Sequence, residues 1–258
     1  MPFVPAYDRA FWQRLTAKLK PAPLGGTLKR IAESQSQVVT LALVDSLDEQ
    51  MLLEQMLESA KPPLPALATQ RKLDYLLSSP WRYPPLRWGS RFGRRFEPSI
   101  FYGSLSDNAL FAEAAWYRWV FLSGLDTPFE DAVVSQHTTF EAQYRAANGC
   151  DLTKAPFAKH KAVLAHRNDY AATQQLGSVL RDRGIEAFVY RSARSQQPAD
   201  NVALLTPSAL RSRKARNLQQ WLCETLTERV SFRRNQQLIS FSRGDFLAEG
   251  ESPAAPLD

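Results

Sequence analysis

Hydrophobic side chains recur at helical spacing near the start of the chain. One stripe repeats every four residues and consists of Phe3, Tyr7, Phe11, Leu15 and Leu19. This spacing predicts an amphipathic helix over residues 6–19. Such a helix can lie on a membrane surface, but packing on the core or on a second subunit is the favoured interpretation. Further along, Ser46 and Glu49 form a capping box that predicts a helix over residues 47–60.

After residue 70, strand and helix patterns alternate. The predicted helices are a short one at 71–77, one capped by Ser106 or Asp107 that runs to 122, one at 170–183 that ends at Gly184, and one at 215–228. The predicted strands are 99–104, 138–146, 185–190, 201–205 and a hairpin of 230–233 with 238–241 that turns at Asn235. Because helices come first and strands interleave later, we expect an α+β fold with a mixed sheet.

Three segments follow from this pattern. We expect a helical N-terminal extension over residues 1–70, a globular domain over 71–250 and a flexible tail over 251–258. The Pro-Leu-Gly-Gly sequence at 23–26 is expected to form a loop within the first segment.

The composition fits a globular protein, since 44% of the 258 residues are apolar and 22% are charged. A disordered or collagen-like chain is therefore excluded. The formal net charge of +6 favours anionic partners without naming one. Neither a signal peptide nor a membrane span is evident, and Cys150 and Cys223 fit no disulfide framework. We therefore expect a cytoplasmic protein with no membrane contact.

Several classes of chemistry lack their residues. The sequence has no phosphate-binding glycine loop of the Walker or Gly-x-Gly-x-x-Gly type. His137, His160 and His166 lack the spacing of metal ligands, so no metal site is expected. The absence of a nucleophile elbow argues against a serine or cysteine hydrolase.

Two local features stand out. Residues 82–95 hold five arginines in fourteen residues, among aromatic and turn residues. Such a segment is either a solvated basic loop or a phosphate-binding loop. Downstream, Glu113 falls in the middle of an apolar helical stripe formed by Ala109, Ala112, Trp116 and Val120. A carboxylate on such a stripe is either paired in an internal salt bridge or functional, because burying it alone is costly.

The ordered set of these residues resembles the signature of the RES domain, the toxin half of bacterial RES-Xre toxin–antitoxin pairs. The resemblance rests on Arg82-Tyr83, Arg91-Phe92, Tyr102, Glu113, and Tyr190-Arg-Ser192-Ala-Arg194 followed by Asn201-Val-Ala-Leu-Leu. It covers roughly residues 76–206, about half the chain. The spacing between Arg82 and Arg91 is short, and the segment after Ser192 lacks a glycine that the family often has there.

The resemblance implies an ADP-ribosyltransferase-like fold and NAD as the substrate, with the catalytic domain over residues 71–250. Carried over by position, Arg82 and Arg91 would hold the diphosphate or an acceptor phosphate, and Glu113 would serve the ribose. Tyr102 would line the nicotinamide side and Ser192 would complete the pocket, with Tyr83 and Arg194 as neighbours. Inorganic phosphate is the expected co-substrate, and no resident cofactor is expected.

The implied activity is cleavage of the nicotinamide N-glycosidic bond of NAD, with phosphorolysis favoured over hydrolysis. The first alternative is a mono-ADP-ribosyltransferase that modifies a host protein. The second is a nucleic-acid-binding module that uses residues 82–95 and 211–216 as phosphate contacts. An Xre-type antitoxin is the implied partner, through which alone nucleic acid would be contacted. Residues 1–70 remain open as a homodimer surface, an antitoxin docking site or a cover for the pocket.

Overall fold

The structure, a computed structural model, describes residues 7–34, 43–125 and 131–247. Its centre is an eight-stranded mixed sheet in the order β1-β2-β5-β4-β3-β6-β7-β8. The strands are β1 Ala22–Glu33, β2 Phe101–Ser104, β3 Val133–Asp151, β4 Ala187–Arg191, β5 Asp200–Leu204, β6 Arg216–Thr225, β7 Arg229–Arg234 and β8 Gln237–Ser242. Because β1 pairs with both β2 and β3, the strands β1, β2, β5, β4 and β3 close into a ring.

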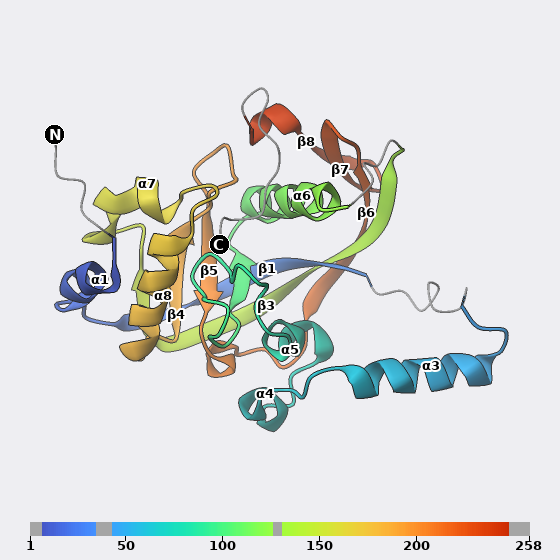
Figure 1. The fold of residues 1–258 in the computed structure, drawn as a ribbon, viewed down its shortest axis with the longest axis horizontal. Coiled ribbons are helices and arrows are strands. Elements are labelled where there is room, and N and C mark those ends of the chain that lie inside the picture. Colours follow the sequence, from blue (N-terminus) through green and yellow to red (C-terminus); the bar gives the residue numbers. More distant parts are fainter. Residues whose placement is uncertain (1–6, 35–42, 126–130, 248–258) are drawn as a thin grey trace.

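Helices lie on both sides of this sheet (Figure 1). They are α1 Arg9–Thr16, α3 Leu47–Ala60, α4 Ala66–Gln70, α5 Tyr75–Arg82, α6 Asp107–Ser123, α7 Lys161–Leu164 and α8 Ala171–Asp182. Helices α1, α7 and α8 gather at one end of the molecule, α6 lies beside β6–β8, and α3 extends away at the opposite end from α1 (Figure 1). None of the helices among the described residues is long and apolar enough to cross a membrane. The eight-stranded mixed sheet and its surrounding helices confirm the expected α+β class.

Alternation along the central strands builds two cores. Ala187 and Val189 of β4 face a cluster that includes Leu77 and Trp81 of α5. Phe188, which lies between them in sequence, faces a second cluster that includes residues of α1 and α8. Successive strand residues point to opposite faces, so a strand buried on both sides reads as a continuous apolar run. This is why the runs at 185–190 and 201–205 were recognisable as strands.

The first helix is where the hydrophobic stripe placed it. Helix α1 begins after Asp8, whose side chain accepts a hydrogen bond from the backbone N–H of Phe11. Trp12 is fully buried, and Phe11 and Leu15 pack against the same core cluster as α8. The described part of the stripe, from Tyr7 to Leu19, therefore packs on the protein core, and the membrane-surface alternative is not needed to explain it.

Helix α3 also forms as predicted, with Ser46 as its N-cap. Its apolar side chains do not reach the core, however: Met51 and Met56 are each 60% exposed. The apolar stripe predicted the helix correctly, but it does not mark a face that packs on the rest of the described chain.

The helical character expected of residues 1–70 is wrong for one segment. Residues 22–33 form β1, which pairs with β3 from Ala22↔Gly149 to Glu33↔His137. The sequence predicts a loop at Gly25 and Gly26, but both glycines lie within this strand. A Cβ on Gly25 would come within 3.1 Å of the Tyr144 carbonyl oxygen, so close strand packing explains the glycine there. The predicted tail at 251–258 lies outside the described residues.

Two predicted helices also need correction. The helix expected at 215–228 is not formed: residues 216–225 within it are strand β6, in which Trp221, Cys223 and Thr225 are buried and Leu222 is half exposed. That period of two belongs to a strand. The helix expected at 71–77 starts later, at Tyr75, because Asp74 caps it and Lys72 has a positive φ of 52° that a helix cannot contain.

Helix α8 lies directly against the arginine-rich segment. A Cβ placed on Gly177 would lie 1.7 Å from the carbonyl oxygen of Phe92. Thr173 of the same helix donates a hydrogen bond to the carbonyl oxygen of Arg91. The backbone that carries Arg91 is therefore fixed by contact with α8, and residue 177 must be glycine for that contact.

We expect Gly177→Ala to destabilise the protein by about 1–3 kcal/mol or more, because the added methyl group forces the two backbones apart. Gly244→Ala is the matched control, since a Cβ there meets nothing within 4 Å. Thermal unfolding followed by circular dichroism measures both. Equal unfolding temperatures for Gly177→Ala and wild type would contradict the packing described.

Candidate active site

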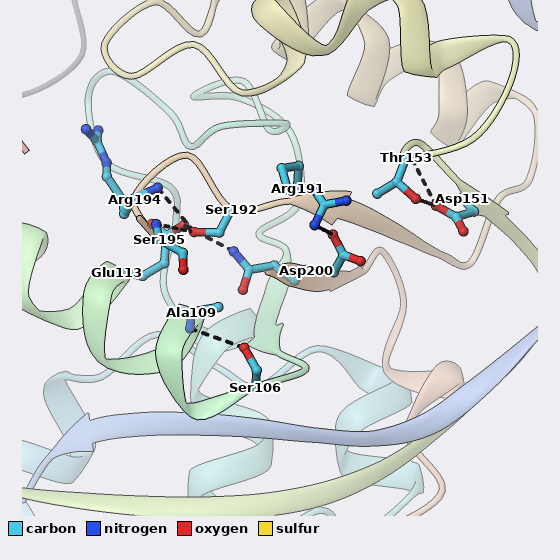
Figure 2. Close-up of polar contacts among 11 residues, drawn as sticks. Ser106, Ala109, Glu113, Asp151, Thr153, Arg191, Ser192, Arg194, Ser195 and Asp200 are labelled. Carbon is cyan, nitrogen blue, oxygen red and sulfur yellow. Dashed lines mark hydrogen bonds and ion pairs between the residues drawn. The ribbon is translucent and has the colours of Figure 1, made fainter. Parts of the chain in front are cut away.

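Helix α6 presents Glu113 toward the ends of the central strands. The helix begins at its N-cap Ser106, whose side chain accepts a hydrogen bond from the backbone N–H of Ala109 at 3.3 Å (Figure 2). Ala109, Ala112 and Trp116 are buried, as the apolar stripe predicted. Glu113 is partly buried beside them. The helix thus holds a carboxylate at the margin of the core.

Two side chains from outside the helix orient this carboxylate. Ser192 Oγ donates a hydrogen bond to Glu113 Oε1 at 2.7 Å (Figure 2). Asn201 Nδ2 donates to the same oxygen at 3.1 Å. The other oxygen, Oε2, receives no hydrogen bond from any residue that the structure describes. One oxygen therefore fixes the carboxylate and the second is available to a ligand.

Ser192 links the carboxylate to the loop between β4 and β5. Its Oγ accepts hydrogen bonds from the backbone N–H groups of Arg194 and Ser195, both at 3.2 Å (Figure 2). The hydroxyl is buried, with 6% of the residue exposed. By accepting from the loop and donating to Glu113, it connects two segments that are far apart in sequence. In this arrangement Ser192 positions Glu113 and the loop together.

The base of this loop is closed by two further contacts. The backbone N–H of Ser192 donates to the carbonyl oxygen of Ala199 at 2.9 Å. Arg191 Nη1 lies 3.0 Å from Asp200 Oδ1 across the β4–β5 register (Figure 2). Both charged side chains are partly exposed, so we assign this ion pair a small share of the stability. Its effect is to fix where the loop leaves the sheet.

Arg91 is buried near the carboxylate. Its Nη1 donates to the carbonyl oxygen of His166 at 2.7 Å, and its guanidinium lies 4.6 Å from the centre of the Tyr170 ring. Burial alone would lower the pKa of Arg91, but Tyr170 and the Glu113 carboxylate favour the charged form and raise it above its ordinary value. Arg91 therefore supplies a fixed positive charge beside Glu113.

Arg194 is the second buried cation of the site. Its guanidinium lies 3.7 Å from the centre of the Trp116 ring, and Nη2 donates to the carbonyl oxygen of Arg167. Burial lowers the pKa of Arg194, with Tyr170 and Glu113 opposing that effect. Nε and Nη1 are buried without a hydrogen-bond partner among the described residues. Leaving buried donors unpaired is costly, so an anion that accepts from them would be stabilised.

Tyr102 supports the arginine segment through its hydroxyl. The hydroxyl oxygen accepts from the backbone N–H of Phe92 at 3.0 Å and shares a hydrogen bond with Ser90 Oγ at 2.9 Å. Burial raises the pKa of Tyr102 to about 12, so the hydroxyl stays protonated. Tyr102 therefore holds the residues on either side of Arg91 in place.

Arg82 and Tyr83 lie apart from this cluster. Arg82, the last residue of α5, donates through Nε to the carbonyl oxygen of Pro62 and through Nη1 to Glu58 Oε1, both at 2.7 Å. Tyr83 is 39% exposed, and its carbonyl oxygen accepts from Ser99 Oγ. The structure thus brings together Glu113, Ser192, Arg91 and Arg194, with Tyr102 behind them. It does not bring Arg82 to Glu113, because α5 carries Arg82 toward α3.

Two residues of the cluster were not singled out from the sequence. Asn201 opens the Asn201-Val-Ala-Leu-Leu run of the family signature but has no predicted role of its own, yet it is 2% exposed and binds Glu113. The signal in the sequence that could have marked Asn201 was a polar residue at the start of a predicted buried strand. Tyr170, which stacks on Arg91, carries no such signal because it lies just before α8 in a region without a motif.

Comparison with known proteins identifies the family. A model of the RES domain family matches residues 65–225. The chain belongs to the RES domain family. The match includes every residue assigned to the cluster above, as well as Arg82 and Tyr83.

No curated protein matches this sequence. Among solved structures, one similar chain comes from the "M.tuberculosis MbcT-MbcA toxin-antitoxin complex". The two sequences are 12% identical, the comparison covers 93% of this chain and 97% of that one, and the TM-score is 0.44.

The bridging role of Ser192 predicts a loss of stability on its removal. Ser192→Ala takes one donor from Glu113 and the acceptor from two backbone N–H groups. We expect the free energy of unfolding to fall by about 2 kcal/mol, given a cost of about 1–3 kcal/mol for a buried group left unsatisfied.

Ser195→Ala serves as the control, because the structure shows no hydrogen bond from the Ser195 side chain to the described residues. Urea unfolding of both variants gives the comparison. If Ser192→Ala is as stable as Ser195→Ala, the hydroxyl does not join the loop to α6.

Proposed function

We propose that this protein is an enzyme that cleaves the nicotinamide N-glycosidic bond of NAD, with inorganic phosphate as the favoured acceptor. The observation that carries the proposal is the Glu113 carboxylate, held through one oxygen by Ser192 and Asn201 while the other oxygen has no donor among the residues that the structure describes. Two buried arginines lie near it. Membership of the RES family supports the same reaction.

One carboxylate is enough for this chemistry. In NAD the nicotinamide ring is a cationic pyridinium, and it departs as neutral nicotinamide. No general acid is therefore needed to protonate the leaving group. In the transition state the ribosyl carbon gains oxocarbenium character. The free oxygen of Glu113 can accept a hydrogen bond from a ribose hydroxyl and stabilise the positive charge on the sugar.

The phosphorolytic step conserves atoms and charge. A phosphate oxygen forms a bond to the ribosyl carbon as the bond from that carbon to the pyridinium nitrogen breaks. The electron pair of the broken bond stays on nitrogen, which gives neutral nicotinamide and ADP-ribose 1-phosphate. Water in place of phosphate would give ADP-ribose, neutral nicotinamide and a released proton.

Arg91 and Arg194 are suited to bind the phosphate groups. Arg194 has two buried donors, Nε and Nη1, without a hydrogen-bond partner in the described part of the chain, and Arg91 is charged and held by Tyr170. Charge-assisted hydrogen bonds to such groups contribute about 1.5–3 kcal/mol each. The stacked rings of Trp116 and Tyr170 keep the two guanidinium groups in place before a ligand arrives.

An enzyme that consumes NAD would harm its own cell unless it is restrained. We therefore also propose that this protein acts as a toxin and that an antitoxin of the Xre type restrains it. Its RES family membership supports this assignment. The net charge of +6 agrees with an anionic substrate and leaves direct binding of nucleic acid without a specific observation in its favour.

Purified protein is expected to release nicotinamide from NAD, faster in phosphate than in a phosphate-free buffer. Glu113→Gln should lower the rate about 100-fold or more, because the amide keeps the shape but loses the charge that stabilises the transition state. Chromatography with mass spectrometry identifies nicotinamide and ADP-ribose 1-phosphate.

Wild-type protein that releases no nicotinamide in either buffer contradicts the proposal. If nicotinamide appears together with ADP-ribose attached to protein, the reaction is ADP-ribosyl transfer instead.

Substitutions at Arg91 and Arg82, the two arginines on which the likeness to the family signature rests, should affect the KM for NAD differently. Arg91→Lys keeps the charge but loses the planar donor set, so we expect the KM for NAD to rise about tenfold. Arg82→Lys should leave the KM near the wild-type value, because Arg82 contacts Glu58 and Pro62. Steady-state kinetics of the two variants measures both KM values. A larger rise in KM for Arg82→Lys than for Arg91→Lys would show that Arg82, and not Arg91, binds NAD.

A further inference from the structure

An aromatic residue follows Glu113 by one helical turn. Glu113, Tyr117 and Phe121 are spaced four apart on α6, so their side chains share one face of the helix. Trp116, next to Tyr117 in sequence, is 1% exposed, whereas Tyr117 is 47% exposed. The helix therefore buries one aromatic ring under Arg194 and presents the next one to solvent on the side of Glu113.

The surroundings of Tyr117 are those of the candidate active site. Its hydroxyl interacts with Tyr170, the residue whose ring stacks on Arg91. Burial raises the pKa of Tyr117 well above its ordinary value, and the proximity of Tyr170 and Glu113 raises it further. The Tyr117 side chain is therefore half exposed and lies close to two residues of the candidate active site, Tyr170 and Glu113.

Tyr102, which the sequence placed on the nicotinamide side, is less suited to contact a ligand ring. Its hydroxyl is engaged by Ser90 and Phe92, and its ring packs at 6.2 Å, edge to face, against Tyr190 of the core. The described residues thus offer a half-exposed aromatic face beside Glu113 at Tyr117.

We propose that Tyr117 forms the binding surface for the nicotinamide ring of NAD, an assignment that rests on the proposed function. Side chains four apart on a helix have Cβ atoms about 5–6 Å apart. The ribosyl carbon, if served by Glu113, is joined by a single bond to the nicotinamide ring. The ring therefore falls within reach of the next helical turn, where Tyr117 lies.

The charge of the ring predicts which kinetic constant depends on Tyr117. Pyridinium is a cation, and a cation over the face of a tyrosine ring is attracted to it. As the glycosidic bond breaks, that positive charge leaves the ring. The contact with Tyr117 therefore stabilises bound NAD more than the transition state, and its loss weakens substrate binding without slowing the chemical step.

The test uses Tyr117→Ala, Tyr117→Phe and the control Phe121→Ala, with NAD and nicotinamide mononucleotide as substrates. Phe121 is a matched control because it is an aromatic residue of the same helix, 66% exposed and one turn further from Glu113. Nicotinamide mononucleotide keeps the nicotinamide riboside but lacks adenosine, so it separates contacts to the two ends of NAD.

We expect Tyr117→Ala to raise the KM about tenfold for both substrates while kcat is unchanged or higher. Tyr117→Phe should stay within about twofold of wild type because the ring face is kept. Phe121→Ala should match wild type. Near-ultraviolet circular dichroism of each variant verifies folding.

Three results would overturn the assignment. A KM change with NAD alone would place Tyr117 at the adenine end. A fall in kcat with an unchanged KM would give it a role in the chemical step, and unchanged constants in Tyr117→Ala would remove it from the site. Wild-type protein that turns over neither substrate contradicts the proposed function itself, and this assignment with it.

Discussion

The hydrogen bond from Ser192 to Glu113 is the contact on which the geometry of the site depends. It joins α6 to the loop between β4 and β5. The same hydroxyl accepts a hydrogen bond from the backbone N–H of Arg194, so the carboxylate and the backbone that carries one cation are positioned together. Because Asn201 binds the same carboxylate oxygen, the other oxygen remains for a ligand. A single serine thus connects the fold to the proposed chemistry.

Without a ligand, the site has an excess of positive charge. Arg91 and Arg194 are both buried, and Glu113 is the carboxylate that influences the pKa of each. Aromatic rings support both guanidinium groups, but two nitrogen atoms of Arg194 have no hydrogen-bond acceptor among the described residues. Unpaired buried donors lower the stability of the free protein, and an anion that accepts hydrogen bonds from them raises it again. The diphosphate of NAD would be one such anion.

The sequence singles out two residues that the fold brings together, Glu113 and Ser192, but it misses part of the sheet around them. Glu113 was recognisable because a charge on an apolar helical stripe is conspicuous, and Ser192 because the family pattern marks it. The strand at 216–225 was missed because its alternation of buried and exposed residues is brief and its polar residues also suit a helix. Arg82 could not be placed from spacing, since only the packing of α5 shows that its guanidinium meets Glu58. A polar residue at the start of a buried strand marked Asn201, but its partner Glu113 follows only from the packing of α6 against β5.

A crystal structure of the Glu113→Gln variant with NAD bound tests the central claim most directly. The account predicts that the nicotinamide ribose lies within hydrogen-bond distance of residue 113 and that the diphosphate contacts Arg91 or Arg194. A separate groove of about 400 Å³, lined by Gly25, Gly26, Arg145 and Arg211 among others, lies along β1 and β3. NAD bound in that groove, with the Glu113 cluster empty, would contradict the account.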